Sequence, residues 1–332
     1  MTQVVIADIA PQFERDVSVE RSILGPAVDV VHCRGAADVD TLVTACRDAD
    51  VVLTDLAPMN RDVIGSLNRC RLISVAGTGY SSIDIAAARD ADISICAIAE
   101  YCTAEVADHA MLLILALSRK LLAWHNQVQH DRSWHFETHG GVARLAELRL
   151  GIVGFGRIGR ALARRARGFG MTILAHDRHA TDNSEADSAV RFCDLDTLFR
   201  ESDVISLNCS MSADNENLID ASAFARMQRR PLFINCARGE MVDEAALVDA
   251  LDSGRISGAG LDVLHGEPPE LESSALSGRD NVILTPHIAF YSDMSLLESR
   301  RISAANIRHF LDGNHDMVSK YVFLSDKRGS FS

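Results

Sequence analysis

The sequence predicts an α/β protein that contains two successive series of parallel strands wound with helices. Short apolar segments alternate with amphipathic ones from the N-terminus, a pattern typical of parallel sheets covered by helices. A polar stretch at residues 130–146, which contains Gly140-Gly141, interrupts this alternation, and a second series begins at Leu148. Because 332 residues suffice for two domains of about 150 residues each, each series is long enough to form its own domain.

The first hundred residues predict one compact α/β unit. Each expected strand is a short apolar run, and the fourth one ends in Gly77-Thr78-Gly79. Strands are expected at residues 4–7, 28–32, 51–54, 72–76 and 93–98, and helices at 39–49, 61–67 and 83–89.

A long helix is expected next, from Thr103 to about Trp124. Thr103 can cap it, and Glu105 and Asp108 suit its positive N-terminal end. We expect a loop over the polar stretch. The second series then predicts strands at residues 150–153, 172–175, 204–207, 232–235, 258–262 and 282–285, with helices at 157–169 and about 295–311.

Composition argues against several classes of function. No apolar run reaches the roughly 18 residues that a membrane span requires. The first residues, Met1-Thr2-Gln3-Val4, lack the basic start and apolar block of a signal peptide, so we do not expect secretion. The net charge of −13 argues against binding to DNA, RNA or anionic membranes, all of which need a basic surface.

Cysteine and histidine spacing predicts neither a disulfide framework nor a metal site. The eight cysteines are scattered and form no Cys-x-x-Cys pair, which favours reduced thiols in a cytoplasmic protein. The cluster His125, His130, His135 and His139 fits no ligand motif, and no cysteine or carboxylate pattern completes it.

A glycine motif joins the first strand of the second series to its helix. The motif is Gly154-Phe155-Gly156-Arg157-Ile158-Gly159, which follows strand 150–153 and opens helix 157–169. The first glycine permits a tight turn, the second lets backbone amides approach a pyrophosphate, and the third lets helix and strand pack closely. Such a motif alone also occurs in ordinary glycine turns. Its place between strand and helix predicts dinucleotide binding, with Gly154, Gly156, Arg157, Ile158 and Gly159 at the cofactor.

Asp177 strengthens that prediction and indicates the cofactor. It lies 18 residues after Gly159, just past strand 172–175, where a carboxylate accepts hydrogen bonds from the adenosine ribose. A carboxylate there repels the 2′-phosphate of NADP, so NAD is the expected cofactor. Arg178 follows directly and can offset part of this repulsion.

Three polar residues follow later strands, at the edge of the sheet where ligands bind in such folds. Arg238 lies in the segment Asn235-Cys236-Ala237-Arg238-Gly239, Glu267 precedes Pro268-Pro269, and His287 follows Pro286. Taken singly, each has an ordinary explanation as a surface charge, a turn acid or a histidine near a strand end.

Together, these segments resemble the D-isomer-specific 2-hydroxyacid dehydrogenase family over roughly residues 40 to 315. The resemblance implies that Arg238 binds the substrate carboxylate and keto oxygen, since its planar fork matches a planar carboxylate. It also implies that Glu267 pairs with His287. As catalytic residues, these three would promote the transfer of a hydride between NAD(H) and a small 2-keto or 2-hydroxy acid, with His287 as acid and base. An opposite charge nearby favours the charged form of histidine, which suits a proton donor.

The same resemblance implies further binding residues. The backbone amides of Gly77-Thr78-Gly79 would bind the substrate carboxylate. The residues expected at the cofactor are Asp262 facing the nicotinamide carboxamide, Thr103 near the nicotinamide, Cys209 at the start of the adenosine-side loop, and Cys236 and Ala237 ahead of Arg238.

The family also implies the domain arrangement and the oligomer. We expect two Rossmann-like or flavodoxin-like doubly wound domains, with an NAD-binding domain at 101–286 inserted into a substrate domain at 1–100 and 287–332. A homodimer is expected through the helix from Thr103 and the loop after it.

Some segments depart from the common family pattern. Cys209-Ser210 replaces a cysteine-proline pair, Arg229-Arg230-Pro231 replaces a lysine-glycine pair, and Tyr80 and Phe290-Tyr291 add bulk. Except for the Arg-Arg-Pro segment, these features resemble the C-terminal binding protein-like branch, which includes NAD(H)-sensing co-repressors. A regulator of that kind is therefore an alternative, as is a dehydrogenase of another donor such as phosphite. Formate is disfavoured because formate dehydrogenases carry glutamine in place of Glu267.

Overall fold

The computed structural model describes residues 1–8, 16–36, 38–179 and 189–325. The chain forms two compact units: unit 1 comprises Met1–Tyr101 and Ser292–Ser332, and unit 2 comprises Cys102–Tyr291. The sequence-based division placed the second boundary after residue 286. Residues 287–291 pack with unit 2 instead, because the amides of Ile288 and Ala289 bond to Asp262 within that unit. What each unit binds stays a prediction.

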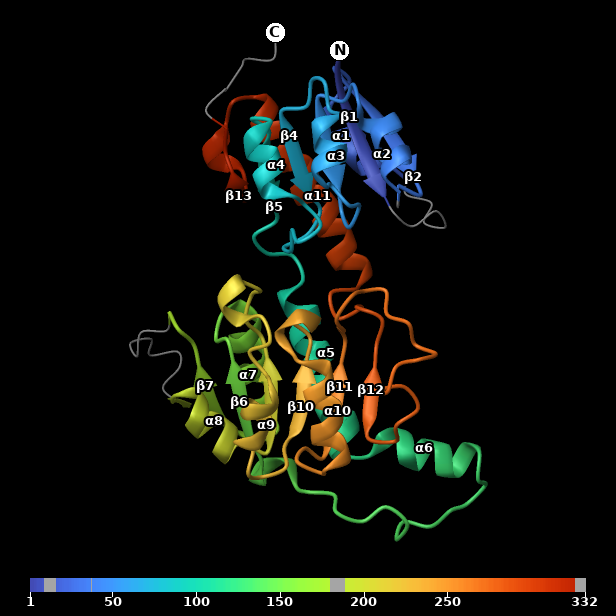
Figure 1. Cartoon of the computed structure of the whole chain (residues 1–332), viewed down its shortest axis with the longest axis vertical. Coiled ribbons are helices and arrows are strands. Elements are labelled where there is room, and N and C mark those ends of the chain that lie inside the picture. The colour runs from blue at the N-terminus through green and yellow to red at the C-terminus, as the bar shows by residue number, and fades with distance from the viewer. Residues whose placement is uncertain (9–15, 37, 180–188, 326–332) are drawn as a thin grey trace. The chain divides into compact units, whose positions relative to one another are not determined.

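Unit 1 is built on a six-stranded sheet with the order β13-β5-β4-β3-β1-β2 (Figure 1). Apart from β13, its strands are parallel and follow the flavodoxin-like order 2-1-3-4-5. The antiparallel edge strand β13 was missed, because it is short and only half-buried. The strands are β1 (Thr2–Asp8), β2 (Val28–Arg34), β3 (Val51–Thr54), β4 (Leu72–Val75), β5 (Ser94–Ala97) and β13 (Lys320–Phe323).

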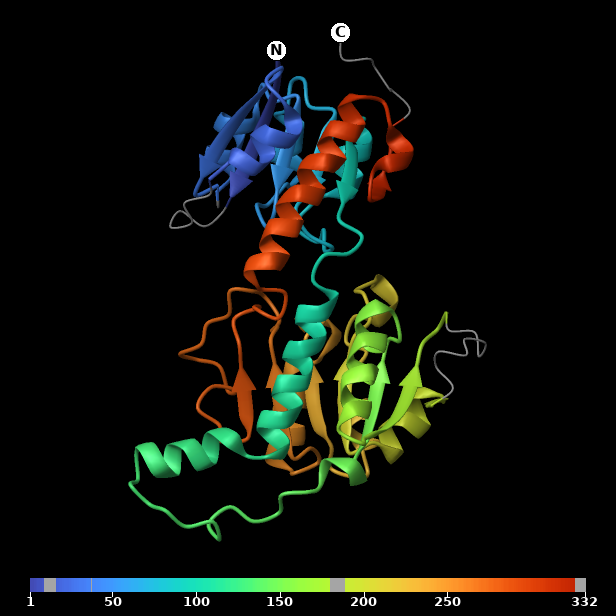
Figure 2. The same ribbon diagram turned by 180° about the vertical axis from the view of Figure 1, so that it is seen from behind.

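Both faces of this sheet are buried, which explains the continuous apolar runs in its strands. In β1, Val4 and Ile6 pack toward one face and Val5 and Ala7 toward the other. The first face packs against α1 (Ser18–Leu24) and α11 (Asp293–Leu311) (Figure 2), and the second against α2 (Val39–Cys46), α3 (Arg61–Gly65) and α4 (Ile85–Asp90).

Unit 2 contains a parallel sheet of seven strands with the order β12-β11-β10-β9-β6-β7-β8. The order reverses at β6, which lies between β7 and β9, as in Rossmann folds. The two doubly wound α/β units confirm the predicted fold class. The strands are β6 (Arg149–Val153), β7 (Thr172–His176), β8 (Val190–Phe192), β9 (Val204–Leu207), β10 (Leu232–Asn235), β11 (Gly258–Leu261) and β12 (Val282–Leu284).

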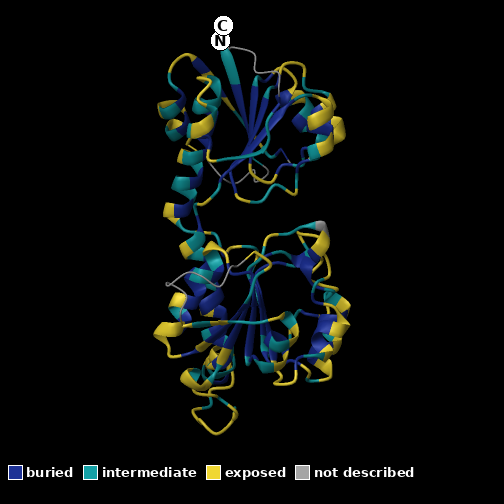
Figure 3. Cartoon of the chain, turned by 90° about the vertical axis from the view of Figure 1, so that its left-hand side faces the viewer, coloured by how far each residue is buried: buried dark blue, intermediate teal, exposed yellow. Residues whose placement is uncertain are grey.

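Helices cover both faces of the unit 2 sheet. On one face, α5 (Thr103–Ser118) packs against α7 (Arg157–Gly168) and crosses β10 and β11 (Figure 2). The other face carries α8 (Leu195–Glu201), α9 (Ala221–Ala225) and α10 (Glu244–Asp252). Figure 3, coloured by burial, shows that the strands form the most buried layer of each unit.

The single long helix expected from Thr103 to Trp124 is wrong in two respects. The helix begins at Thr103 with Cys102 as its N-cap, and no described side chain caps it, so Thr103 is not a capping residue. It ends at Ser118, and α6 (Leu121–Gln129) starts a new helix. Lys120 between them has a φ of 51°, a left-handed conformation that breaks the helix. Its ammonium donates a hydrogen bond to the carbonyl of Gly140 in the polar stretch.

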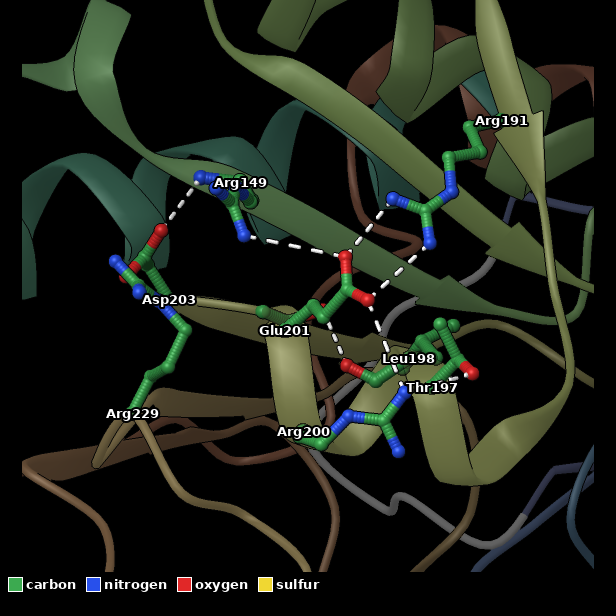
Figure 4. Close-up of polar contacts among 9 residues, drawn as sticks. Arg149, Arg191, Thr197, Leu198, Arg200, Glu201, Asp203 and Arg229 are labelled. Carbon is green, nitrogen blue, oxygen red and sulfur yellow. Dashed lines mark hydrogen bonds and ion pairs between the residues drawn. The ribbon is translucent and has the colours of Figure 1, made fainter.

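Ionic contacts join segments at the amino ends of the unit 2 strands (Figure 4). Asp203, before β9, accepts hydrogen bonds from the Arg149 amide at 2.9 Å and from the Arg229 guanidinium at 2.7 Å. Glu201, at the end of α8, accepts two bonds from Arg191 of β8, at 2.8 and 3.2 Å. These contacts lie at the amino ends of the strands, whereas the glycine motif lies at the carboxyl end of β6.

Replacing Glu201 by glutamine is expected to lower the melting temperature at pH 7. The hydrogen bonds from Arg191 hold the pKa of Glu201 below its ordinary value. Its contribution to stability is therefore present above the ordinary pKa and is lost as the pH falls through the lowered one. The difference in melting temperature between wild type and E201Q should shrink in that acidic range. E216Q is the matched control, since Glu216 is exposed and forms no ion pair in the described part of the chain. Equal melting temperatures for E201Q and wild type at pH 7 would contradict the prediction.

Candidate active site

The carboxyl ends of the unit 2 strands meet at one edge of the sheet. The glycine motif follows β6, Asp177 follows β7 and Cys209 follows β9. Arg238, Asp262 and His287 come after β10, β11 and β12 respectively. Because all these strands are parallel, the predicted residues of unit 2 gather on the side where ligands bind in open α/β sheets.

The three glycines of the motif meet different surroundings. Gly154 has a φ of +90°, and a Cβ there would lie 2.5 Å from the Cys209 amide nitrogen. A Cβ on Gly159 would lie 2.3 Å from the carbonyl oxygen of Gly154. In contrast, a Cβ on Gly156 would meet nothing within 4 Å. The first and third glycines are thus required by the protein's own packing, whereas the second faces open space at the N-terminus of α7, which suits a pyrophosphate.

Asp177 is fixed at the glycine turn. Its Oδ2 accepts the Phe155 amide at 2.7 Å, and its Oδ1 accepts the His179 amide at 2.8 Å. Arg178 pairs instead with Asp214, at 3.4 Å. The carboxylate therefore lies beside the motif, where a Rossmann fold binds the ribose.

The loop that carries Arg238 is held by Asn235, whose role the sequence did not reveal. Buried Asn235 accepts the Ala237 amide and donates to the carbonyl of Arg238, both at 2.9 Å. Gly239 completes the loop, because a Cβ there would lie 2.0 Å from the backbone of Leu264. Two residues of this loop, Cys236 and Ala237, are buried.

His287 and Glu267 form the predicted pair. The distance from His287 Nδ1 to Glu267 Oε2 is 2.5 Å, and the Leu264 amide donates to Glu267 Oε1 at 3.1 Å. About a third of each side chain is exposed, 33% for His287 and 32% for Glu267. No residue in the described part of the chain bonds His287 Nε2, which leaves this nitrogen available to a ligand.

The charges around Glu267 favour its ionised form. Burial alone would raise the pKa of Glu267, but the hydrogen bond and charge of His287, the Leu264 amide and the charge of Arg238 together lower it. The carboxylate consequently persists as the pH falls below its ordinary pKa and is lost only as the pH falls through the lowered one. The guanidinium of Arg238 itself donates a hydrogen bond to the carbonyl of Ala237 at 2.6 Å.

Asp262 organises the turn that carries His287. It is 1% exposed, and its two oxygens accept the Thr285 hydroxyl at 2.6 Å and the amides of Ile288 and Ala289 at 2.9 and 2.8 Å. Its carbonyl accepts the His287 amide at 2.8 Å. His287 itself has a φ of 52°, in the left-handed region that β-carbon-bearing residues seldom adopt. The contact of Asp262 with a nicotinamide stays a prediction.

The remaining predicted residues lie on the elements expected for them. Gly77-Thr78-Gly79 follows β4 in unit 1, and the Gly77 carbonyl accepts the Ile98 amide at 2.9 Å. Thr103 is the first residue of α5. Cys209 lies against Gly154 and contacts Met241, with its sulfur 3.7 Å from the Met241 sulfur, and burial raises the pKa of its thiol.

Neither a cluster of metal ligands nor a membrane-spanning helix occurs in the described part of the chain. Within residues 1–8, 16–36, 38–179 and 189–325, no three His, Cys, Asp or Glu side chains gather closely enough to hold a metal ion. No helix in the same ranges is long and apolar enough to span a bilayer.

Known proteins identify the family. The sequence pattern described as "D-isomer specific 2-hydroxyacid dehydrogenase, NAD binding domain" matches residues 111–289. The chain is 33% identical over 282 residues to a hydroxypyruvate reductase of Blautia hydrogenotrophica, covering 83% of this chain and 87% of that protein. It is 34% identical over 287 residues to a glycerate dehydrogenase of Methylorubrum extorquens, covering 84% and 88%. The crystal structure of an Aquifex aeolicus D-lactate dehydrogenase complexed with NAD and lactic acid superposes with a TM-score of 0.84 at 27% identity, covering 96% of this chain and 98% of that one.

The chain therefore belongs to the D-isomer-specific 2-hydroxyacid dehydrogenase family and carries its NAD-binding domain. It is an NAD-dependent oxidoreductase that acts on CH–OH groups. The predicted family, enzyme class and cofactor are confirmed.

Proposed function

We propose that this protein reduces a small 2-keto acid to the D-2-hydroxy acid with NADH, using His287, Glu267 and Arg238. The observation that carries the proposal is the 2.5 Å contact between His287 and Glu267, which lie after the carboxyl ends of β12 and β11, as the glycine motif and Arg238 lie after β6 and β10. Relatives named hydroxypyruvate reductase and glycerate dehydrogenase support a substrate of this small size.

Residues of unit 2 would hold the cofactor. The open space at Gly156 and the N-terminus of α7 suit the pyrophosphate, and Asp177 suits the adenosine ribose. Since Asp177 is a carboxylate, we expect NADH to be preferred over NADPH. Thr103, Cys209, Cys236, Ala237 and Asp262 complete the proposed site. When bound, the cofactor supplies the hydride.

His287 would act as the acid in reduction. Its Nδ1 is taken by Glu267, so the proton leaves from Nε2 to the keto oxygen of the substrate. The lowered pKa of Glu267 keeps this partner negative, and its hydrogen bond holds the imidazole in place. In the oxidation of a hydroxy acid, neutral His287 would act as the base.

Arg238 would bind the substrate carboxylate and stabilise the negative charge that builds on the keto oxygen. Its guanidinium suits both tasks, because it remains charged and presents two parallel donors. The amides of Gly77-Thr78-Gly79 would bind the carboxylate as well. Unit 1 is thus the proposed substrate domain and unit 2 the NAD-binding domain.

The assembly we propose is a homodimer. Leu112 of α5, Leu121 and Leu122 of α6, and Trp134 and Phe136 of the loop after it are all exposed. An apolar surface of this kind is typical of an interface between subunits. The eight free cysteines are consistent with the reducing cytoplasm that we propose as its compartment.

Alanine substitutions at two glycines of the motif should separate binding from folding. G156A is expected to keep its unfolding free energy within about 0.5 kcal/mol of wild type and to weaken NADH binding by about tenfold, because the new methyl group occupies the approach of the pyrophosphate. G159A is expected to lose about 1–3 kcal/mol of stability, because its Cβ would overlap a backbone carbonyl. Urea unfolding and NADH fluorescence titration measure the two effects. Unchanged NADH affinity in G156A would refute the proposed pyrophosphate position.

The proposed reaction is tested by NADH oxidation with glyoxylate, hydroxypyruvate and pyruvate, with NADPH in parallel. We expect turnover on at least one of these acids, faster with NADH than with NADPH. Tight binding of NADH without turnover on any 2-keto acid would contradict the proposal and favour a sensor or another donor.

A further inference from the structure

His109 of α5 contacts the turn that carries His287. Its side chain is only 12% exposed. However, its Nε2 lies 3.0 Å from the Thr285 hydroxyl and 3.6 Å from Asp262 Oδ1. A nearly buried histidine thus points its nitrogen at the residues that shape the active-site turn.

The direction of these hydrogen bonds follows from the number of protons available. The hydroxyl of Thr285 has one proton, which it donates to Asp262 Oδ1 at 2.6 Å. Toward His109, the same hydroxyl must therefore act as acceptor. The bonds run from His109 Nε2–H to the Thr285 hydroxyl and from there to Asp262 Oδ1.

This chain of bonds ends on the carboxylate that holds the turn. Oδ1 of Asp262 accepts a hydrogen bond from the amide of Ile288, and Oδ2 accepts one from the amide of Ala289. The backbone carbonyl of Asp262 accepts the amide of His287. The left-handed backbone at His287 persists only where surrounding contacts determine it. Contacts that fix the orientation of the Asp262 side chain therefore also fix the direction in which the His287 side chain points from the backbone.

We propose that His109 is a positioning residue for proton transfer, acting through Thr285 and Asp262 on the turn of His287. The inference rests on the proposed role of His287 as acid and base. Thr285 and His109 lie 176 residues apart in the sequence, on the last segment of unit 2 and on its first helix. The contact therefore ties the segment where the chain enters unit 2 to the segment where it leaves.

Four variants and one double variant test this proposal. H109F keeps the bulk of the ring without a donor, whereas H109Q retains an N–H near the position of Nε2. T285V removes the hydroxyl at nearly constant shape, whereas T285S keeps it. We expect H109F and T285V each to lower kcat by about 10- to 100-fold, with the KM for NADH and the melting temperature near wild type. H109Q and T285S should recover most of kcat, and H109F/T285V should be no slower than the slower single variant.

Hydrogen exchange supplies a readout that needs no substrate. The amides of Ile288 and Ala289 bond to Asp262, so peptides that cover residues 287–289 should exchange faster in H109F and T285V than in wild type, H109Q and T285S. Unchanged exchange in H109F overturns the proposal. So does a kcat in H109F equal to that of wild type, or an H109Q variant as slow as H109F. If wild type shows no turnover on any 2-keto acid, the proposed function fails, and the exchange rates still decide whether His109 holds the turn.

Discussion

Replacing His287 by alanine is expected to lower kcat/KM for the 2-keto acid by about 10²- to 10⁴-fold, while the affinity for NADH stays near that of wild type. The imidazole has its Nδ1 bonded to Glu267, and its Nε2 makes no hydrogen bond with a described residue, so we expect the side chain to serve the substrate rather than the fold. A third of it is exposed, so truncation leaves no large cavity. Steady-state kinetics and NADH fluorescence titration measure the two quantities.

A matched control is H139A. His139 lies in the polar stretch, packs against Trp124 of α6 and plays no part in the proposed chemistry. It should leave kcat/KM unchanged. If H287A loses affinity for NADH to the same extent as activity, His287 is a structural histidine, and the proposed acid–base role is wrong.

Replacing Arg238 by lysine is expected to lower kcat/KM by about 10²- to 10³-fold. Lysine keeps the charge but loses the planar pair of donors that matches a carboxylate. The KM for the keto acid should rise as well, while NADH affinity remains near wild type. Because Asn235 and Gly239 hold the backbone of this loop, the substitution should not disturb its course.

R229K provides the control for Arg238, since Arg229 pairs with Asp203 at the opposite edge of the same sheet. We expect its kinetics to equal those of wild type. An R238K variant with wild-type kcat/KM would show that Arg238 binds neither the substrate carboxylate nor the keto oxygen.

Most of the fold could be predicted because parallel strands are buried on both faces. Their apolar runs, such as Val51–Thr54 and Val204–Leu207, are plain in the sequence. The strands β8 and β13 lack this signal, since each is short and none of its residues is fully buried. The break at Lys120 escaped prediction because Leu121 and Leu122 continue the leucine pattern into a second helix.

The residues of the candidate site could be predicted where chemistry restricts the residue type. The glycine motif, Asp177, Arg238, Glu267 and His287 fall in this group. The residues that position them could not, because their partners are distant in the sequence. Thr285 is 23 residues from Asp262 and 176 from His109, and nothing in the local sequence of α5 indicates that contact.

The most direct test of the central claim uses NADH in which both hydrogens at C4 of the nicotinamide are deuterium, and follows the deuterium into the product. The experiment uses hydroxypyruvate or pyruvate, whichever has the higher turnover, because the glycolate formed from glyoxylate has no D and L forms. The product is analysed by mass spectrometry and chiral chromatography. The proposed hydride transfer predicts a D-2-hydroxy acid that carries one deuterium at C2. An unlabelled product, an L-hydroxy acid, or no product despite bound NADH would contradict it.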